Sequence, residues 1–285
     1  MLETIFCEMD DFCKFLSKEL KTNFLDGNQK QGRKRKLTWS EILTINVFYH
    51  YSGYKNFKSY YINCIKVQNK LAFNDLPSYN RFSELMQQST LPLFLFFKLK
   101  ASSNCTGISI IDSYPLIACH IKRQYGHKVF YGCAAKGKTS VGWFFGFKLH
   151  IVINNFGEII DVCITPGNVA DNNKQTAKKL TKNIFGKLLA DKGYIGLFKE
   201  FFDRGIQLIH KLRSNMKNKL IDLGDRLLLK KRGIIESVGN ILKHKFNLEH
   251  TRHRSYANFL TNIFSTLIAY HFKPNKPSFG HFNLI

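Results

Sequence analysis

A stretch near the C-terminal end of the chain, KKRGIIESVGNILKHKF (230–246), places one acid between two bases. On an α-helix at about 100° per residue, Arg232, Glu236 and Lys243 fall within roughly 40° of one another. Apolar residues crowd the opposite side of this predicted helix. An isolated pattern of this kind is typical of a solvated helix with a local Glu–Arg pair at i, i+4. Its meaning therefore depends on which other acids the chain brings near it.

Two aspartates follow apolar runs that we predict to be buried strands. Asp112 ends the run GISIIDS, and Asp191 follows KLLA in KLLADKGY. In α/β sheets the ends of strands are where a rigid scaffold presents side chains to ligands. Most aspartates in such positions only begin a turn or cap a helix. The combination of Asp112 and Asp191 with Glu236 is what indicates a functional site.

Three carboxylates are suited to phosphoryl transfer assisted by two metal ions. Two Mg²⁺ (or Mn²⁺) ions, roughly 3.5 to 4 Å apart, hold the attacking and leaving oxygens and prefer carboxylate ligands. Such a site repels a polyanionic substrate unless cations surround it. The chain supplies such cations, since residues 113–157 contain Lys122, Arg123, Lys128, Lys136, Lys138 and Lys148 and no Asp or Glu. The residues we expect to bind phosphate are Arg232, Lys243, Lys192 and Lys148.

Two further residues are secondary candidates for this site. Asp171 in PGNVAD competes with Asp191 for the place of the middle carboxylate, although its position before NNKQTAKKL also predicts a helix N-cap. We favour Asp191 because it ends a predicted strand. His150 faces the site if its strand is suitably oriented, but a lone histidine in a strand is more often a packed core residue.

An α/β layer structure must position these acids, and its pattern begins at Gly107. Apolar runs predict strands at GISIIDS, PLIACHI, FFGFKLHIVIN, GEIIDVCITPG, KLLAD and IQLIHKL, with a hairpin around residues 154–157. Helices are predicted at NNKQTAKKLTKNIF and GLFKEFFDRG, before the helix that carries Glu236. We therefore predict a mixed sheet with flanking helices.

The N-terminal part of the chain is predicted to be all-helical. Residues 1 to about 30 have apolar residues at helical spacing, and the basic run RKRK (33–36) follows. Thr38 or Ser40 caps a helix over SEILTINVFYHYS, and Ser78 begins another over YNRFSELMQQS. We predict a helical DNA-binding module at 1–100 and a catalytic domain with a C-terminal helix at 101–285. No stretch is identifiable as a recognition helix.

The composition favours a polyanionic partner. Lys plus Arg number 43 against 20 Asp plus Glu, which gives a formal charge of +23. This balance makes double-stranded DNA the leading partner and leaves no indication of a small-molecule substrate. We expect no membrane association, because no apolar run is long enough to span a bilayer and no compact polybasic block adjoins an amphipathic anchor. The acidic start lacks a secretory signal, so we expect a cytoplasmic, nucleoid-associated protein.

These residues and motifs give the chain a family resemblance. It resembles the DDE transposases of bacterial insertion sequences, in the subgroup with a short helical N-terminal region, whose catalytic domain is RNase H-like. The spacing of Arg232, Glu236 and Lys243 matches the R-x3-E-x6-K part of the family's signature, while its tyrosine position is Leu229 here. The segments IDSYPL, ADKGY, FFGFKLHIVIN, TPGNVAD and HTRHRS also look like this family.

The resemblance implies a reaction and an assembly. It implies that Asp112, Asp191 and Glu236 are the catalytic, metal-binding carboxylates, with two Mg²⁺ (or Mn²⁺) ions as cofactors. A protein of this kind binds the terminal inverted repeats of its own element, cleaves there and joins the freed 3′-hydroxyl to target DNA. The resemblance also implies a homo-oligomer on paired DNA ends. Two alternatives stay open: a catalytically inactive DNA-binding remnant that acts as a repressor, and an RNase H-like nuclease.

Overall fold

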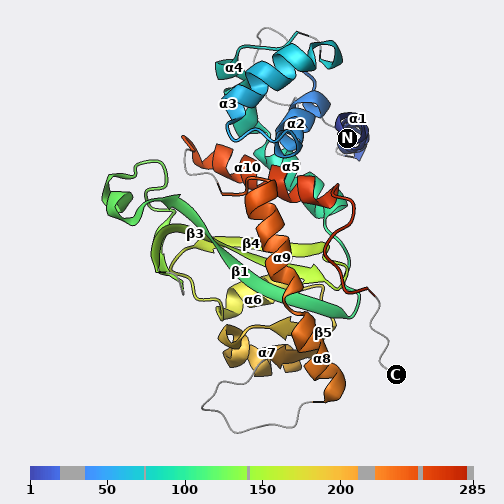
Figure 1. Ribbon diagram of the computed structural model, residues 1–285, viewed down its shortest axis with the longest axis vertical. Coiled ribbons are helices and arrows are strands. Elements are labelled where there is room, and N and C mark those ends of the chain that lie inside the picture. Colours follow the sequence, from blue (N-terminus) through green and yellow to red (C-terminus); the bar gives the residue numbers. More distant parts are fainter. Residues whose placement is uncertain (20–35, 74, 140–141, 211–221, 250–252, 281–285) are drawn as a thin grey trace. The chain divides into compact units, whose positions relative to one another are not determined.

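The computed structural model describes residues 1–19, 36–73, 75–139, 142–210, 222–249 and 253–280 (Figure 1). The chain divides into two compact units. The first contains residues 1–101, 242–248 and 253–273, and the second contains residues 102–241, 249–252 and 274–285. Within the described ranges, no helix combines the length and the apolar character that crossing a membrane requires.

The first unit is helical. Its α-helices are α1 (Leu2–Glu19), α2 (Trp39–Phe48), α3 (Phe57–Ser59), α4 (Tyr79–Gln88), α5 (Thr90–Phe96) and α10 (Tyr256–His271). The predicted start of α2 is confirmed, because Thr38 and Glu41 form a reciprocal capping box. Ser78 likewise accepts a hydrogen bond from the backbone N–H of Arg81 at the start of α4. The predicted first helix is present as α1, whereas residues 33–35 of the basic run lie outside the described residues.

Two buried contacts join the C-terminal segments of the first unit to its N-terminal helices. The His50 ring nitrogen Nδ1 lies 2.6 Å from the carbonyl oxygen of Phe246. The Tyr51 hydroxyl donates to the carbonyl of Ala269 in α10 at 2.7 Å. Because His50 is buried, its pKa is lowered to about 4, and the ring is neutral at physiological pH.

The second unit is built on a mixed sheet. Its strands are β1 (Ile108–Cys119), β2 (Ala135–Lys138), β3 (Trp143–Asn154), β4 (Ile159–Pro166), β5 (Gly186–Ala190) and β6 (Ile206–His210). The strand order is β2-β3-β1-β5-β6, and β4 pairs with the same strand, β3, as β2 does. β3 runs antiparallel to its three partners, whereas β5 runs parallel to β1 and β6. The predicted mixed sheet with flanking helices, preceded by a helical region, is confirmed.

Strand β1 is longer than the sequence pattern indicates. The runs GISIIDS and PLIACHI, which predict separate strands, form one strand, and Asp112 lies inside it instead of at its end. The cause is β3, which pairs along nearly the whole of β1, from Ser109 to Cys119. β5 pairs only with residues 108–110, so the part of β1 that contains Pro115 has a neighbour on one side alone. A residue without an N–H is tolerated in such an edge position.

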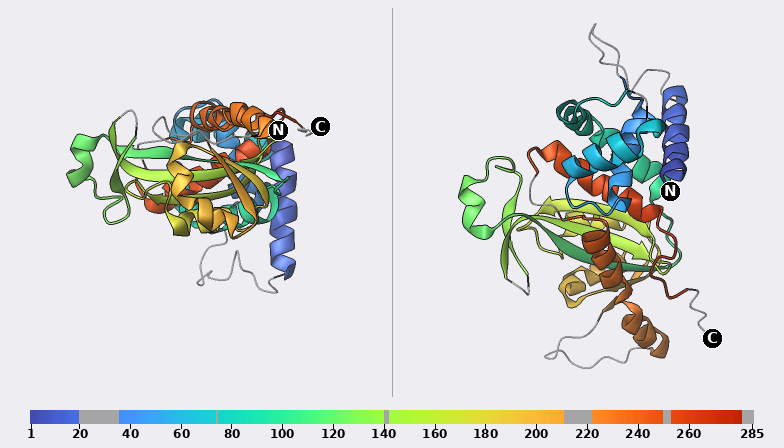
Figure 2. Two further views of the ribbon diagram at one scale, coloured as in Figure 1. Left: turned by 90° about the horizontal axis from the view of Figure 1, so that it is seen from below. Right: turned by 45° about the horizontal axis from the view of Figure 1, so that its top comes forward.

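Helices cover both faces of this sheet (Figures 1 and 2). They are α6 (Lys174–Leu180), α7 (Phe198–Phe202), α8 (Leu223–Lys231) and α9 (Ile234–Asn240). Ile111 of β1 packs in a buried cluster with Leu180 of α6 and Phe201 of α7. Tyr114 of β1 contacts α9 instead. Because side chains alternate along a strand, these two residues mark opposite faces of β1.

The predicted continuous helix over residues 230–246 is wrong in one respect. α8 ends at Lys231, α9 begins at Ile234, and a π-helical segment, Ile241–Lys245, follows it. Gly233 lies in the break. Glycine loses more conformational freedom in a helix than any other residue, so the break falls where the helix is weakest. Arg232 and Glu236 consequently lie on either side of a turn.

Candidate active site

Asp112 and Asp191 are neighbours across two parallel strands. Ile110 of β1 lies opposite Leu189 of β5, and each aspartate follows two residues later in its own strand direction. In-register residues of parallel strands point to the same face of a sheet. Asp191 keeps an extended backbone after β5 ends, and its carboxylate accepts no hydrogen bond from the turn that it begins. Asp112 is thus inside β1 but lies where the pairing with β5 stops.

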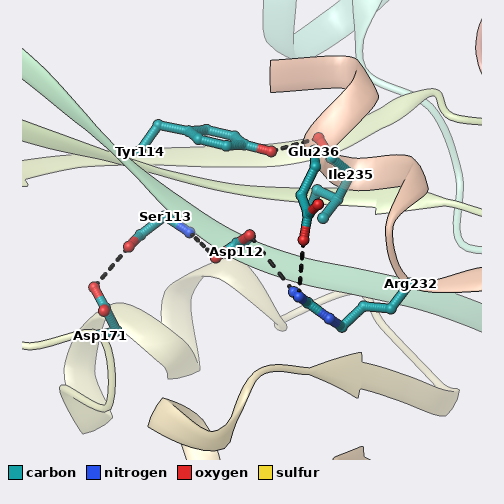
Figure 3. Close-up of polar contacts among 7 residues, drawn as sticks. All are labelled: Asp112, Ser113, Tyr114, Asp171, Arg232, Ile235 and Glu236. Atoms are coloured by element: carbon teal, nitrogen blue, oxygen red, sulfur yellow. Dashed lines mark hydrogen bonds and ion pairs between the residues drawn. The ribbon is translucent and has the colours of Figure 1, made fainter. Parts of the chain in front are cut away.

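Arg232 joins Asp112 to Glu236 (Figure 3). Its Nη2 atom lies 3.0 Å from Glu236 Oε1, which is the predicted i, i+4 pair, and its Nη1 atom lies 3.6 Å from Asp112 Oδ2. The Arg232 side chain is only 16% exposed, whereas that of Glu236 is 59% exposed. The guanidinium therefore lies between a strand carboxylate and a helix carboxylate, at the position of the break between α8 and α9.

Tyr114 holds α9 against β1. Its hydroxyl donates a hydrogen bond to the carbonyl of Ile235, the residue before Glu236 (Figure 3). A Cβ atom on Gly239, one turn further along α9, would lie 2.5 Å from the Tyr114 ring. Glycine is thus required for the helix to approach the ring this closely. The contact between β1 and α9 sets where Glu236 stands relative to Asp112.

The charges at this site are crowded. Burial raises the pKa of Asp112 to about 6. The Ser113 backbone N–H and the Arg232 guanidinium lower this pKa, and the negative charges of Asp191 and Asp171 raise it further. The carboxylates are therefore close enough to repel one another. A bound cation would relieve this repulsion.

Asp171 lies behind β1, on the face opposite Asp112. The Ser113 hydroxyl donates to Asp171 Oδ1 at 2.7 Å (Figure 3), and the Lys148 ammonium lies 3.0 Å from the same oxygen. Ser113 follows Asp112 directly, so its side chain points to the other face. The predicted N-cap role of Asp171 is wrong, because the side chain of Asn173 accepts the capping hydrogen bond of α6.

The remaining predicted residues lie in different surroundings. His150 is fully buried, its Nε2 lies 2.9 Å from the Thr165 hydroxyl, and burial lowers its pKa to about 4. Lys148 is nearly buried beside Asp171. Lys192 is exposed directly after Asp191. Lys243 belongs to the π-helical segment Ile241–Lys245, and its part of that segment, from Leu242 on, is assigned to the first unit.

Sequence reasoning missed two tyrosines close to the carboxylates, Tyr114 and Tyr194. Tyr114 was identifiable, because the period of two along a strand puts it on the same face as Asp112. Tyr194 is buried, and its hydroxyl finds no hydrogen-bond partner in the described part of the chain. Burial is the main cause of the raised pKa of Tyr194, and the nearby charges of Asp171, Asp112 and Asp191 raise this pKa further. No spacing signal connects Tyr194 with Asp171.

The donor set consists of carboxylate oxygens, the ligand type that hard divalent ions prefer. Asp112 and Asp191 share one face, and Glu236 is connected to that face through Arg232. Among the residues that the structure describes, however, no three His, Cys, Asp or Glu side chains are grouped closely enough to hold a metal ion. The guanidinium of Arg232 takes the space between Asp112 and Glu236.

The central part of the chain matches a known protein family. A family model described as "Transposase DDE domain" matches residues 102–256. Similar solved structures include the crystal structure of the Mos1 strand transfer complex and the Mos1 transposase paired-end complex with left transposon end. Each is 13% identical with a TM-score of 0.24, and the match covers 93% of this chain and 87% and 88% of those chains. A comparison with curated proteins found no match.

Proposed function

The chain belongs to the family of transposases with a DDE domain, and we propose that it cleaves and joins DNA at the ends of an insertion sequence. It binds the terminal inverted repeats of its own element and hydrolyses a phosphodiester bond there. The freed 3′-hydroxyl then attacks target DNA. The observation that carries this proposal is the placement of Asp112 beside Asp191, with Glu236 linked to Asp112 by Arg232.

We assign Asp112, Asp191 and Glu236 as the catalytic carboxylates. Transposase DDE domains use divalent metal ions, and we propose that these three residues hold two Mg²⁺ (or Mn²⁺) ions. When bound, such ions activate water and stabilise the leaving oxygen. Arg232 pairs with both Asp112 and Glu236 in this structure and offsets part of their charge. It must leave the space between them for both to bind metal, and a DNA phosphate is its natural next partner.

The choice of Asp191 over Asp171 is supported by the faces of the sheet. Asp191 shares the face of Asp112, whereas Asp171 is bound from the opposite face through Ser113. The ammonium of Lys148 also neutralises Asp171. The Ser113 hydroxyl and the Lys148 ammonium bind the same Asp171 oxygen, which supports a structural role for Asp171. In this proposal Lys148 holds Asp171, and Arg232, Lys192 and Lys243 bind phosphate.

The rest of the chain serves DNA binding and assembly in this proposal. The helical region 1–100 holds duplex DNA next to the inverted repeats, and residues 101–285 carry the catalytic domain. The formal charge of +23 supports attraction to DNA of any sequence. Two DNA ends must be joined to one target, which calls for a homo-oligomer. The protein then acts in the cytoplasm, on the nucleoid.

Cleavage assays on single variants test these roles. Labelled duplex that carries the ends of the element is incubated with Mg²⁺ and with Asp112→Asn, Asp191→Asn, Glu236→Gln or Asp171→Asn. We expect the first three variants to bind the duplex and to lose cleavage, and Asp171→Asn to keep cleavage below its melting temperature. Full activity of Asp191→Asn, or inactivity of a folded Asp171→Asn, would contradict the assignment.

Two outcomes separate the alternatives. Cleavage of an RNA–DNA hybrid in preference to the end-containing duplex would identify an RNase H-like nuclease. Specific binding of the element ends by the wild-type protein without cleavage of any substrate, at any Mg²⁺ or Mn²⁺ concentration, would identify an inactive remnant that acts as a repressor.

A further inference from the structure

The segment between β1 and β3 projects from the sheet as an arm (Figures 1 and 2). We define the arm as residues 120–139 together with Gly142 and Trp143; it contains a 3-10 helix, Ile121–Gly126, and strand β2. No residue of the arm is acidic. Its exposed basic side chains are Lys122, Arg123, Lys128, Lys136 and Lys138. The arm therefore presents an excess of positive charge to solvent.

Three aromatic side chains on the arm are exposed. Tyr125 is 94% exposed, Tyr131 is 87% exposed and Trp143 is 56% exposed. The arm does not need them for its own packing, because Phe130 is buried and packs edge-on against Phe147, with ring centroids 5.3 Å apart. Clusters of exposed apolar and aromatic groups commonly mark a binding site.

Trp143 sits among cations on the open face of the hairpin β2–β3. Lys138 lies directly opposite Trp143, and Lys136 shares its face. The ammonium groups lie 4.4 Å (Lys136) and 5.5 Å (Lys138) from the centre of the tryptophan ring system. The other face is closed, because a Cβ on Gly137 would lie 2.6 Å from the Phe144 ring. The aromatic group and the cations are thus presented together on one side.

We propose that the arm binds an unpaired DNA strand, with bases stacked on Trp143, Tyr131 and Tyr125 and phosphates held by the lysines. Stacking on a protein ring requires a free base face, and a duplex has none to offer except at its ends. A surface that served duplex DNA alone would need the cations without the rings. Base stacking is also stronger than an exposed cation–π contact, so a base can take a place over the indole while Lys136 turns to a phosphate.

The position of the arm fits a role during the reaction. β1 carries Asp112 and enters the arm after Cys119, seven residues later. This corresponds to roughly 23 Å of extended chain, or about seven stacked nucleotides. The inference rests on the proposed function, because cleavage of one strand at an element end frees a 3′ end near Asp112 that can separate from its complementary strand.

Tryptophan fluorescence provides a direct test on the full chain. The chain has two tryptophans, so Trp39→Phe leaves Trp143 as the only one. We expect oligothymidine of 20 nucleotides to quench Trp143 strongly and the matched duplex to quench it weakly, in metal-free buffer where no cleavage occurs. Because stacking is lost, Trp143→Ala and Tyr131→Ala should each weaken single-strand binding about tenfold or more and change duplex binding less than twofold.

Variants of the lysines and of the aromatic residues separate the contribution of phosphate binding from that of base stacking. Lys136→Gln with Lys138→Gln should flatten the salt dependence of single-strand binding and leave the quenching at saturation unchanged. Equal quenching by duplex, or equal losses of duplex and single-strand affinity in Trp143→Ala, would overturn the proposal. Displacement of the oligonucleotide by poly-glutamate at equal charge would assign the arm to an acidic protein instead. If the wild-type protein prefers single-stranded DNA but cleaves no element-end duplex in the presence of Mg²⁺, only the proposed function is contradicted.

Discussion

Gly239→Ala tests whether the contact between α9 and β1 sets the position of Glu236. The new Cβ would lie 2.5, 2.6 and 2.8 Å from three atoms of the Tyr114 side chain. Carbon atoms in protein interiors pack at about 3.5 to 4.0 Å, so either the ring or the helix must move. The ring is restrained because its hydroxyl donates to the carbonyl of Ile235.

Opposing effects decide how much Gly239→Ala changes the free energy of unfolding. Replacing a helical glycine by alanine stabilises a helix by about 1 kcal/mol. Overpacking costs about 1 to 3 kcal/mol, and losing the hydrogen bond between Tyr114 and Ile235 costs about 1 kcal/mol more. We therefore expect the free energy of unfolding to fall by about 1 to 3 kcal/mol. If α9 shifts by about 1 Å, Glu236 moves with it, and we expect cleavage to slow by about 100-fold.

Urea denaturation and the cleavage assay measure the two effects on the same preparation. Gly233→Ala is the matched control, because a Cβ there meets nothing within 4 Å. Tyr114→Ala should make Gly239→Ala harmless to stability, as a double-mutant cycle would reveal. If Gly239→Ala matches the control in both stability and cleavage, the contact does not position Glu236 and the reasoning fails.

Two further predictions concern the buried charges. Because burial raises the pKa of Asp112 from 3.8 to about 6, the folded state binds this proton more tightly, so the wild-type protein loses stability as pH rises from about 4 to 6. Asp112→Asn should therefore be more stable than wild type at pH 8 by about 2 to 3 kcal/mol in metal-free buffer, and a gain of equal size at pH 4 would contradict this. Asp171→Ala leaves the Lys148 ammonium unpaired, and we expect a loss of about 2 kcal/mol, most of which Lys148→Met should restore in the double variant. Purely additive losses in urea denaturation would show that the two residues are not coupled.

Local signals in the sequence predict much of this fold. Thr38 with Glu41 and Ser78 begin their helices because their side chains satisfy free N–H groups, whatever surrounds them. The hairpin of residues 154–157 also forms as predicted, with Gly157 at a positive φ of 70°. Such features depend only on nearby residues. The acidic candidates Asp112, Asp191 and Glu236 were identifiable for a related reason, since chemistry limits which residue types can serve.

Long-range pairing decided where those candidates stand. The sequence predicts a strand end at Asp112, but β3 continues past it and the end of pairing comes from β5. Asp171 is a plausible N-cap by pattern alone, yet Asn173 takes that role and Asp171 binds Ser113 instead. Both outcomes depend on which strand or side chain arrives from a distant part of the chain.

The sequence by itself determined the residue types, the local elements and the i, i+4 pair of Arg232 and Glu236, because these depend on spacing along one chain. Only the tertiary structure decided that Asp112 and Asp191 share a face and that Arg232 also reaches Asp112. The physical reason is that the face and register of a strand are set by its partners, and a sequence pattern holds no record of which partner a strand will meet.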